Sequence, residues 1–337
     1  MTFPATNAKR KATVPSAGQV TFGLFALFCL LLILRNAELA IAYVNTGLKL
    51  CAKAVVPSLF PFMVLSELIV SGASESQWIK RLTKPLQRLF GLPAAGCTAA
   101  LLGMLCGFPV GAKCAMLSYE RGELTKKEAQ HVLLFSNNPS SAFLISAVGV
   151  SLWESRAFGV MLYAITLSVS LLTGFLYRFL QRKEEIPTLW GSPLPSSAPL
   201  SGARLFTNSI ASATGSILLV CAYVVFFSVL TGTLNLCLGA LRLPSEISSL
   251  ISCLLELSGG VSKASTLSNA PLAALLCAFA AGWSGLSVHC QVLSVCDGKG
   301  LSFGPYFIAK LIQGILCALL MGVAVYFCPA LLQPQSL

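Results

Sequence analysis

Long uncharged runs alternate with short basic clusters along the chain, and this pattern predicts helices that cross a membrane. The apolar runs cover residues 20–34, 54–72, 92–110, 158–176, 205–241 and 303–327, with a lone acid at Glu67 and a lone base at Lys310. A helix needs about 20 apolar residues to cross a bilayer, so the chain has room for roughly eight to ten crossings. Because backbone groups in lipid must bond within helices, the pattern predicts an all-α polytopic membrane protein.

Composition strengthens this prediction. Hydrophobic residues make up 55% of the 337 residues and charged residues only 10%, with a mean hydropathy of +0.79. Soluble domains carry about 25% charged residues, so a soluble enzyme, an extended nucleic-acid binder and a disordered chain are excluded. The net charge of +11 comes from clusters such as 80–88 and 178–183. Clusters of this kind between apolar runs are typical of cytoplasmic loops.

The chemistry of common catalytic and metal sites is missing from the sequence. The 13 cysteines form no Cys-x-x-Cys pair and lie mostly in apolar stretches, so we interpret them as packing residues. Two histidines do not suffice for a His-rich metal site. No nucleophile–base constellation or phosphate-binding loop stands out. We therefore expect no enzyme activity, no cofactor and no nucleic-acid partner; the expected partners are a small solute and the bilayer, and a homo-oligomer is left open.

A Pro- and Ser-rich stretch divides the chain near its middle. The expected organisation is a cytoplasmic tail at 1–18, a first helix and first repeat at 19–180, a cytoplasmic linker at 181–203, a second repeat at 204–328 and a tail at 329–337. A cleaved signal peptide is the alternative for the first apolar run. We favour an uncleaved helix, because no small-x-small cleavage site follows cleanly and many further spans come later.

The two halves carry similar features in the same order. Four pairs correspond: Gly91-Leu92-Pro93 with Arg242-Leu243-Pro244, Lys113 with Lys263, Asn137–Ser140 with Gly282–Gly285, and Phe158-Gly159 with Phe303-Gly304, at offsets between 145 and 151 residues. This order predicts an internal repeat. If both basic clusters are cytoplasmic, the run at 54–72 points inward and its equivalent at about 206–232 points outward. The repeats are then inverted in topology, with broken or re-entrant elements near 104–115 and 254–266.

The first candidate motif is Cys106-Gly-Phe-Pro-Val-Gly-Ala-Lys113, in which Gly107, Pro109 and Gly111 interrupt an apolar run. A broken helix exposes N–H groups that attract anions, and Lys113 adds a full positive charge. The alternative is a kinked packing helix with Lys113 reaching the interface.

The third motif, Glu256–Lys263, takes the same place in the second half and includes Gly259 and Gly260. Glu256 is a candidate for proton or ion coupling, unless it forms a structural pair with Lys263.

The second and fourth motifs supply neutral polar groups. Asn137, Asn138 and Ser140 surround Pro139, where they either meet a polar ligand or form an ordinary capped turn. Ser284, Ser287 and Gln291, next to Gly285, share one helical face. His289 could carry a proton, although a lone histidine is more often a packing residue. Glu67 is a further coupling candidate, with a helix-end role as the alternative.

At these motifs the sequence resembles the YlbJ (SpoVV) family of sporulation integral membrane proteins, within a nucleoside-recognition or gate-domain group that looks like the core of concentrative nucleoside transporters. The resemblance rests on Gly107–Lys113, Phe135–Pro139 and Ser284–Val288 with Gln291, and it extends over about residues 20–328. It implies a transporter that moves dipicolinate into the forespore across the outer forespore membrane. The alternatives are a nucleoside or other carboxylate transporter of the same fold, and a non-transporting scaffold for spore assembly.

From the residues we expect a site for a small anion. Dipicolinate is a planar dianion at neutral pH and requires compensating charge inside a membrane. Lys113 and Lys263 follow Gly-rich breaks in equivalent positions, so we expect both lysines and two half-helix N-termini to converge on its carboxylates. The Asn, Ser and Gln side chains would surround the ring.

Overall fold

The computed structural model describes residues 17–72, 76–181 and 202–333, and these residues form helices without a strand. The predicted tail at 1–18 and linker at 181–203 lie almost entirely outside the described residues. An all-α polytopic architecture is confirmed: four helical spans are long and apolar enough to cross a bilayer, or up to six if each bent helix pair is one span. The continuous ones are α8 (Arg156–Gln181), α9 (Gly202–Ala240) and α14 (Gly304–Phe327).

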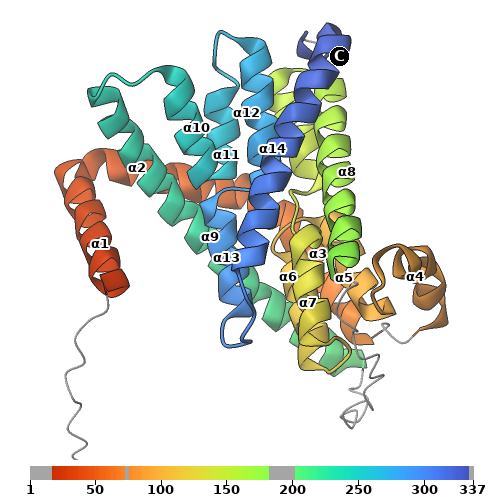
Figure 1. Ribbon diagram of the computed structural model, residues 1–337. Coiled ribbons are helices and arrows are strands. Elements are labelled where there is room, and N and C mark those ends of the chain that lie inside the picture. Colours follow the sequence, from red (N-terminus) through yellow and green to blue (C-terminus); the bar gives the residue numbers. More distant parts are fainter. Residues whose placement is uncertain (1–16, 73–75, 182–201, 334–337) are drawn as a thin grey trace, which may run out of the picture.

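The chain begins with two helices that precede the repeated part and lead into the helix that opens the first repeat. Helix α1 (Ala17–Arg35) meets α2 (Ala37–Leu50) at a sharp bend, and a π-helical turn, η1 (Cys51–Val55), leads into α3 (Val56–Gly72). In Figure 1, α1 stands apart from the body of the molecule. Most of its large side chains are exposed, including Leu24, Leu31 and Leu34, as expected of a helix in contact with lipid.

The first repeat contains two broken helical elements followed by a long helix. After α4 (Gln77–Phe90), α5 (Ala94–Cys106) ends at the first motif and α6 (Val110–Glu120) turns back beside it. A Cβ on Gly103 would lie only 2.6 Å from the Cα of Gly111, so the two half-helices touch backbone to backbone. Next, α7 (Lys126–Ser136) breaks at the second motif, continues as the π-helical segment η2 (Phe143–Leu152), and leads into α8.

The second repeat has the same order of elements. Helix α10 (Ser245–Leu255) breaks at Glu256 and α11 (Leu257–Ala264) returns beside it, with a Cβ on Gly260 placed 2.5 Å from the Cα of Cys253. Helix α12 (Ala270–Trp283) breaks at Ser284 and continues as α13 (Leu286–Cys296), which leads to α14. A final 3-10 turn, η3, covers Pro329–Leu332.

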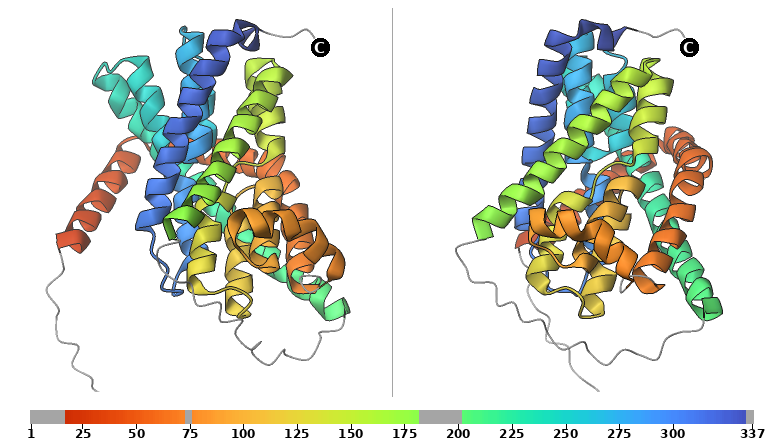
Figure 2. Two further views of the ribbon diagram at one scale, coloured as in Figure 1. Left: turned by 45° about the vertical axis from the view of Figure 1, so that its right-hand side comes forward. Right: turned by 90° about the vertical axis from the view of Figure 1, so that its right-hand side faces the viewer.

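The two hairpins enter from opposite ends of the molecule. Figure 1 places α10 and α11 in its upper half and α5, α6 and α7 in its lower half, and Figure 2 shows the same separation from two other sides. Helix α8 runs toward the lower end and α14 away from it. This arrangement is the predicted inverted repeat.

The number of full crossings is smaller than the eight to ten expected from chain length. The two hairpins explain the difference, because α5 has 13 residues and α10 has 11. At 1.5 Å per residue each half-helix is about 16–20 Å long, roughly half the hydrocarbon thickness. The apolar sequences of α5 and α10 therefore predict that these segments are buried in the membrane, but not that they cross it completely.

Arg178, the described basic residue of the second cluster, lies beside the first basic cluster on α4, as the charge pattern predicts. The guanidinium of Arg178, at the end of α8, donates to the carbonyl of Leu89 in α4 at 2.9 Å. The positive-inside rule favours a cytoplasmic location for this end.

Candidate functional site

The first two motifs cross and hold each other through hydrogen bonds. The amide of Phe108 donates to the carbonyl of Asn138 at 3.0 Å, and the amide of Ala112 donates to Asn137 Oδ1 at 3.0 Å. Gly107 has φ +86, and a Cβ there would lie 2.7 Å from the amide of Ser140. A glycine is therefore required at position 107, where the break between α5 and α6 contacts the break that follows α7. Two distant segments of the sequence thus form one junction.

The two asparagines act mainly as caps in this junction. Asn137 Nδ2 donates to the carbonyl of Leu133 at 3.1 Å, and Asn138 Nδ2 donates to that of Phe135 at 2.8 Å. Both carbonyls belong to the last turn of α7, where helical partners end. Since Asn137 Oδ1 also caps α6, its side chain is largely committed inside the protein, while Asn138 Oδ1 has no hydrogen-bond partner among the described residues.

The third and fourth motifs form the equivalent junction in the second repeat. Glu256 caps α11, accepting from the amides of Ser258 at 2.9 Å and Gly259 at 2.5 Å. Gly285 passes close by, since a Cβ there would lie 2.9 Å from the amide of Leu257. The predicted half-helix N-terminus is therefore present, but the chain's own carboxylate binds it. An external anion would compete with Glu256 for this place.

A cavity of about 80 Å³ lies where the two junctions face each other. Its polar lining comes from both repeats: Ser140 from the first, and Glu256, Ser258 and Gln291 from the second. The apolar remainder includes Phe108 and Phe143, together with residues of α2, α3 and α9. Ligand pockets usually measure about 300–1,000 Å³, so a planar diacid fits only after the junctions separate.

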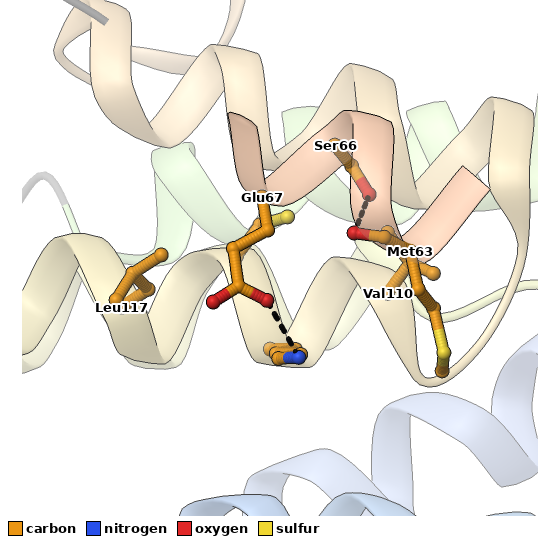
Figure 3. A pocket seen from close by; sticks show the side chains of 7 residues that line it. Met63, Ser66, Glu67, Val110 and Leu117 are labelled. Carbon is orange, nitrogen blue, oxygen red and sulfur yellow. Dashed lines mark hydrogen bonds and ion pairs between the residues drawn. The ribbon is translucent and has the colours of Figure 1, made fainter. Parts of the chain in front are cut away.

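Neither lysine predicted to bind the anion lines this cavity, and the two share no partner. Lys113 Nζ lies 2.8 Å from Glu67 Oε2 on α3, and Figure 3 shows this ion pair beside a small pocket. Lys263 Nζ donates to Asn235 Oδ1 on α9 at 2.6 Å and to the hydroxyl of Ser248. The alternative Glu256–Lys263 pair is not formed, because Glu256 binds its own helix.

The two lysines are nevertheless equivalent within their repeats. Each stands on the returning half-helix of a hairpin and binds an oxygen on the helix that opens the repeat, α3 or α9. The first repeat has more residues between lysine and partner because α4 is inserted there. Both contacts therefore anchor a hairpin to its repeat.

A double-mutant cycle tests this anchoring role. We expect Glu67→Gln and Lys113→Met each to destabilise the detergent-solubilised protein by about 1–3 kcal/mol, because each leaves a half-buried charge without its partner. The double variant should recover more than half of the loss in the midpoint of thermal unfolding. Losses in the two single variants that simply add in the double variant would contradict the anchoring role.

His289 lies in an aromatic cage. Its ring is fully buried, with centroids 4.3 Å from Trp283 and 5.1 Å from Phe307, and its Nδ1 is 3.1 Å from the hydroxyl of Tyr306. Such surroundings favour the packing interpretation over a proton carrier in contact with the cavity.

Lys310 and Gln313 on α14 are the residues that the motif analysis missed. Lys310 is 1% exposed, and its Nζ donates to the carbonyl of Asn137 at 2.8 Å and to Gln313 Oε1 at 3.0 Å. Gln313 Nε2 in turn donates to the carbonyl of Leu134 at 2.7 Å. The signal was present in the sequence as one lysine in a 25-residue apolar run, because a charge inside a membrane marks function by default.

Gln313 also lies against the second junction. A Cβ on Gly282, at the end of α12, would lie 2.7 Å from the carbonyl oxygen of Gln313. Helix α14 therefore contacts the broken span of each repeat, and both hydrogen-bond acceptors of Lys310 are uncharged.

Several buried polar atoms around the junctions have no hydrogen-bond partner among the described residues. They are Ser136 Oγ, Asn138 Oδ1, Ser284 Oγ, Ser287 Oγ, His289 Nε2 and Gln291 Oε1. Buried polar atoms are normally satisfied, so a cluster of exceptions in the predicted motifs favours a polar ligand there. In the described part of the chain, no group of three His, Cys, Asp or Glu side chains is placed to hold a metal.

Comparison with known proteins agrees with the resemblance seen in the motifs. No family model matches the chain, and no solved structure does. The sporulation integral membrane protein YlbJ of Bacillus subtilis (strain 168) is 27% identical over 327 residues, covering 87% of this chain and 79% of that protein. The match therefore includes both repeats and both junctions. The resemblance to the YlbJ family is confirmed by this match, and together with the apolar helices it shows an integral membrane protein.

Proposed function

We propose that the protein is a secondary transporter or facilitator for a small anion, with dipicolinate as the substrate, moved into the forespore across the outer forespore membrane. The main support for transport is the cavity between the two junctions. These junctions belong to hairpins that enter from opposite ends of the molecule (Figure 1). Irregular backbone inside a membrane is tolerated where it lines a cavity or is buried in protein. A scaffold for spore assembly would need neither the breaks nor the polar lining. Sporulation as the setting follows from the similarity to YlbJ.

The charges around the cavity suggest how an anion is accepted. Glu256 is the ionisable residue among those lining it, and an ionised carboxylate there repels a dianion. Lys310, which donates to the carbonyl of Asn137, is the fully buried lysine among the described residues, and both of its acceptors are uncharged. We therefore assign Lys310 to charge compensation and Glu256 to proton coupling. Protonation of Glu256 removes the repulsion when the anion enters.

Glu256→Gln isolates the proton step. Wild-type dipicolinate uptake into proteoliposomes should rise as the pH is lowered below neutral, because protonated Glu256 favours the anion. Glutamine keeps the shape of the protonated acid, so we expect uptake to persist without this pH dependence. Ser258→Ala, which changes the same cavity without removing a titratable group, should keep the wild-type profile. An unchanged profile in Glu256→Gln would remove Glu256 from the coupling step.

Spore chemistry tests the function as a whole. Deletion of the gene should yield spores depleted in dipicolinate, although the mother cell still makes it. Normal dipicolinate in the mutant spores would contradict the proposal. Among the residues that the structure describes, no cationic side chain lines the cavity beside Glu256, and this also favours a second candidate, an uncharged nucleoside-like substrate. Competition between dipicolinate and nucleosides for uptake distinguishes the two candidates.

A further inference from the structure

Helix α4 presents three different faces. One face is buried against the protein through Ile79, Thr83 and Phe90, which are 2%, 1% and 1% exposed. A second face exposes three large apolar side chains, Trp78, Leu82 and Leu89. The third carries four basic residues, Lys80, Arg81, Lys84 and Arg88, and the helix contains no acidic residue. At 100° per residue the apolar and basic sets fall on separate arcs.

The helix lies at the side of the molecule, across the direction of its neighbour. It meets α5 at a bend of 93°, and Figure 2 shows it projecting from the lower half of the body. Gly91, with φ +67, ends α4 and allows this turn. The bond from Arg178 to the Leu89 carbonyl and the packing of Phe90 on Phe135, at 4.6 Å between ring centroids, hold the end of α4 in place.

Helix α4 has no counterpart in the second repeat, so the hairpin fold does not require it. An exposed apolar face next to a basic one suits a helix in the interface of a membrane. The cytoplasmic leaflet carries anionic lipids that attract such basic segments. An acidic protein partner would explain the basic face but leave Trp78, Leu82 and Leu89 without a role.

We propose that α4 is a binding surface for anionic lipid headgroups of the cytoplasmic leaflet. Arg81, Lys84 and Arg88 contact the phosphate groups, and the exposed apolar face enters the upper acyl region. This inference concerns a surface outside the transport cavity and stands whether or not dipicolinate is the substrate.

Fluorescence quenching of Trp78 in vesicles tests the proposal on the full chain. The signal of Trp78 is the difference between the protein and its Trp78→Phe variant. It is measured in vesicles that contain either dibrominated phosphatidylglycerol or dibrominated phosphatidylcholine at the same mole fraction. We expect stronger quenching by the anionic lipid. Arg81→Gln/Lys84→Gln should remove most of that preference, and high salt should lower it in the unaltered protein.

A matched control removes two charges elsewhere at the same end. Lys126→Gln/Lys127→Gln changes two exposed lysines at the start of α7 and should leave the preference of Trp78 unchanged. Equal quenching by both lipids in the unaltered protein, or an unchanged preference in Arg81→Gln/Lys84→Gln, would overturn the proposal. So would a Trp78 that neither lipid quenches, the outcome expected if a soluble protein covers α4.

Discussion

Lys310→Met is expected to lower the apparent affinity for dipicolinate by about ten- to a hundredfold in proteoliposome uptake. The ammonium is fully buried on α14, and both of its hydrogen-bond acceptors are uncharged. Lys310 does not line the cavity, so its attraction for the dianion is coulombic. At a separation of about 10 Å and an effective dielectric constant of about 20, this attraction is about 1.7 kcal/mol for each negative charge, and 1.4 kcal/mol corresponds to tenfold in affinity. Methionine has similar length and fits an irregular apolar space. The main loss is therefore the charge.

Gln313→Leu is the matched control, because it perturbs the same network without removing a charge. It leaves the Leu134 carbonyl unpaired and takes one acceptor from Lys310. Both variants should be less stable, but only Lys310→Met should show the large rise in KM for the dianion. A wild-type KM in Lys310→Met, at normal abundance, would show that the lysine only supports the α7 break. Equal KM changes in the two variants would support the same conclusion.

The breaks and their inverted order could be predicted from the sequence because they depend on local chemistry. Gly107 and Pro109 end α5, and Pro139 interrupts α7, wherever those segments lie in space. The repeat followed from the order of such features. The expected number of membrane crossings was wrong because an apolar run of 11–13 residues has the same sequence pattern in a hairpin as in part of a full span.

The partners of the charged residues could not be predicted, because they come from distant segments. Asn235, which binds Lys263, lies near the C-terminal end of a long apolar helix and belongs to no motif. The sequence also suggested that half-helix N-termini are available to substrate. Glu256 and Asn137 instead cap them from inside the protein, two residues that the motif analysis had assigned to coupling and to ligand binding. A polar motif in a membrane protein can therefore either cap a helix or bind a ligand, and only the three-dimensional structure distinguishes the two roles.

The largest structural effect is expected from Gly103→Ala. A Cβ at this position would lie 2.2 Å from the carbonyl oxygen of Ser136 and 2.6 Å from the Cα of Gly111. Both atoms are backbone, so no side-chain rotation relieves the clash, and α5 must move away from α6 and α7. Overpacking of this kind costs about 3 kcal/mol or more. We expect a strongly lowered midpoint of thermal unfolding in detergent and reduced abundance in the membrane.

Two further substitutions make this a test of the inverted repeat. Gly260→Ala should be similarly harmful, because its Cβ would lie 2.5 Å from the Cα of Cys253 in the equivalent hairpin. Gly215→Ala on α9 meets nothing within 4 Å, and alanine there should leave stability unchanged or raise it by about 0.5–1 kcal/mol. If Gly103→Ala were as stable as Gly215→Ala, the half-helices would not touch at backbone distance. If the half-helices of each repeat touch at a glycine, Gly103→Ala and Gly260→Ala should lose stability while Gly215→Ala does not.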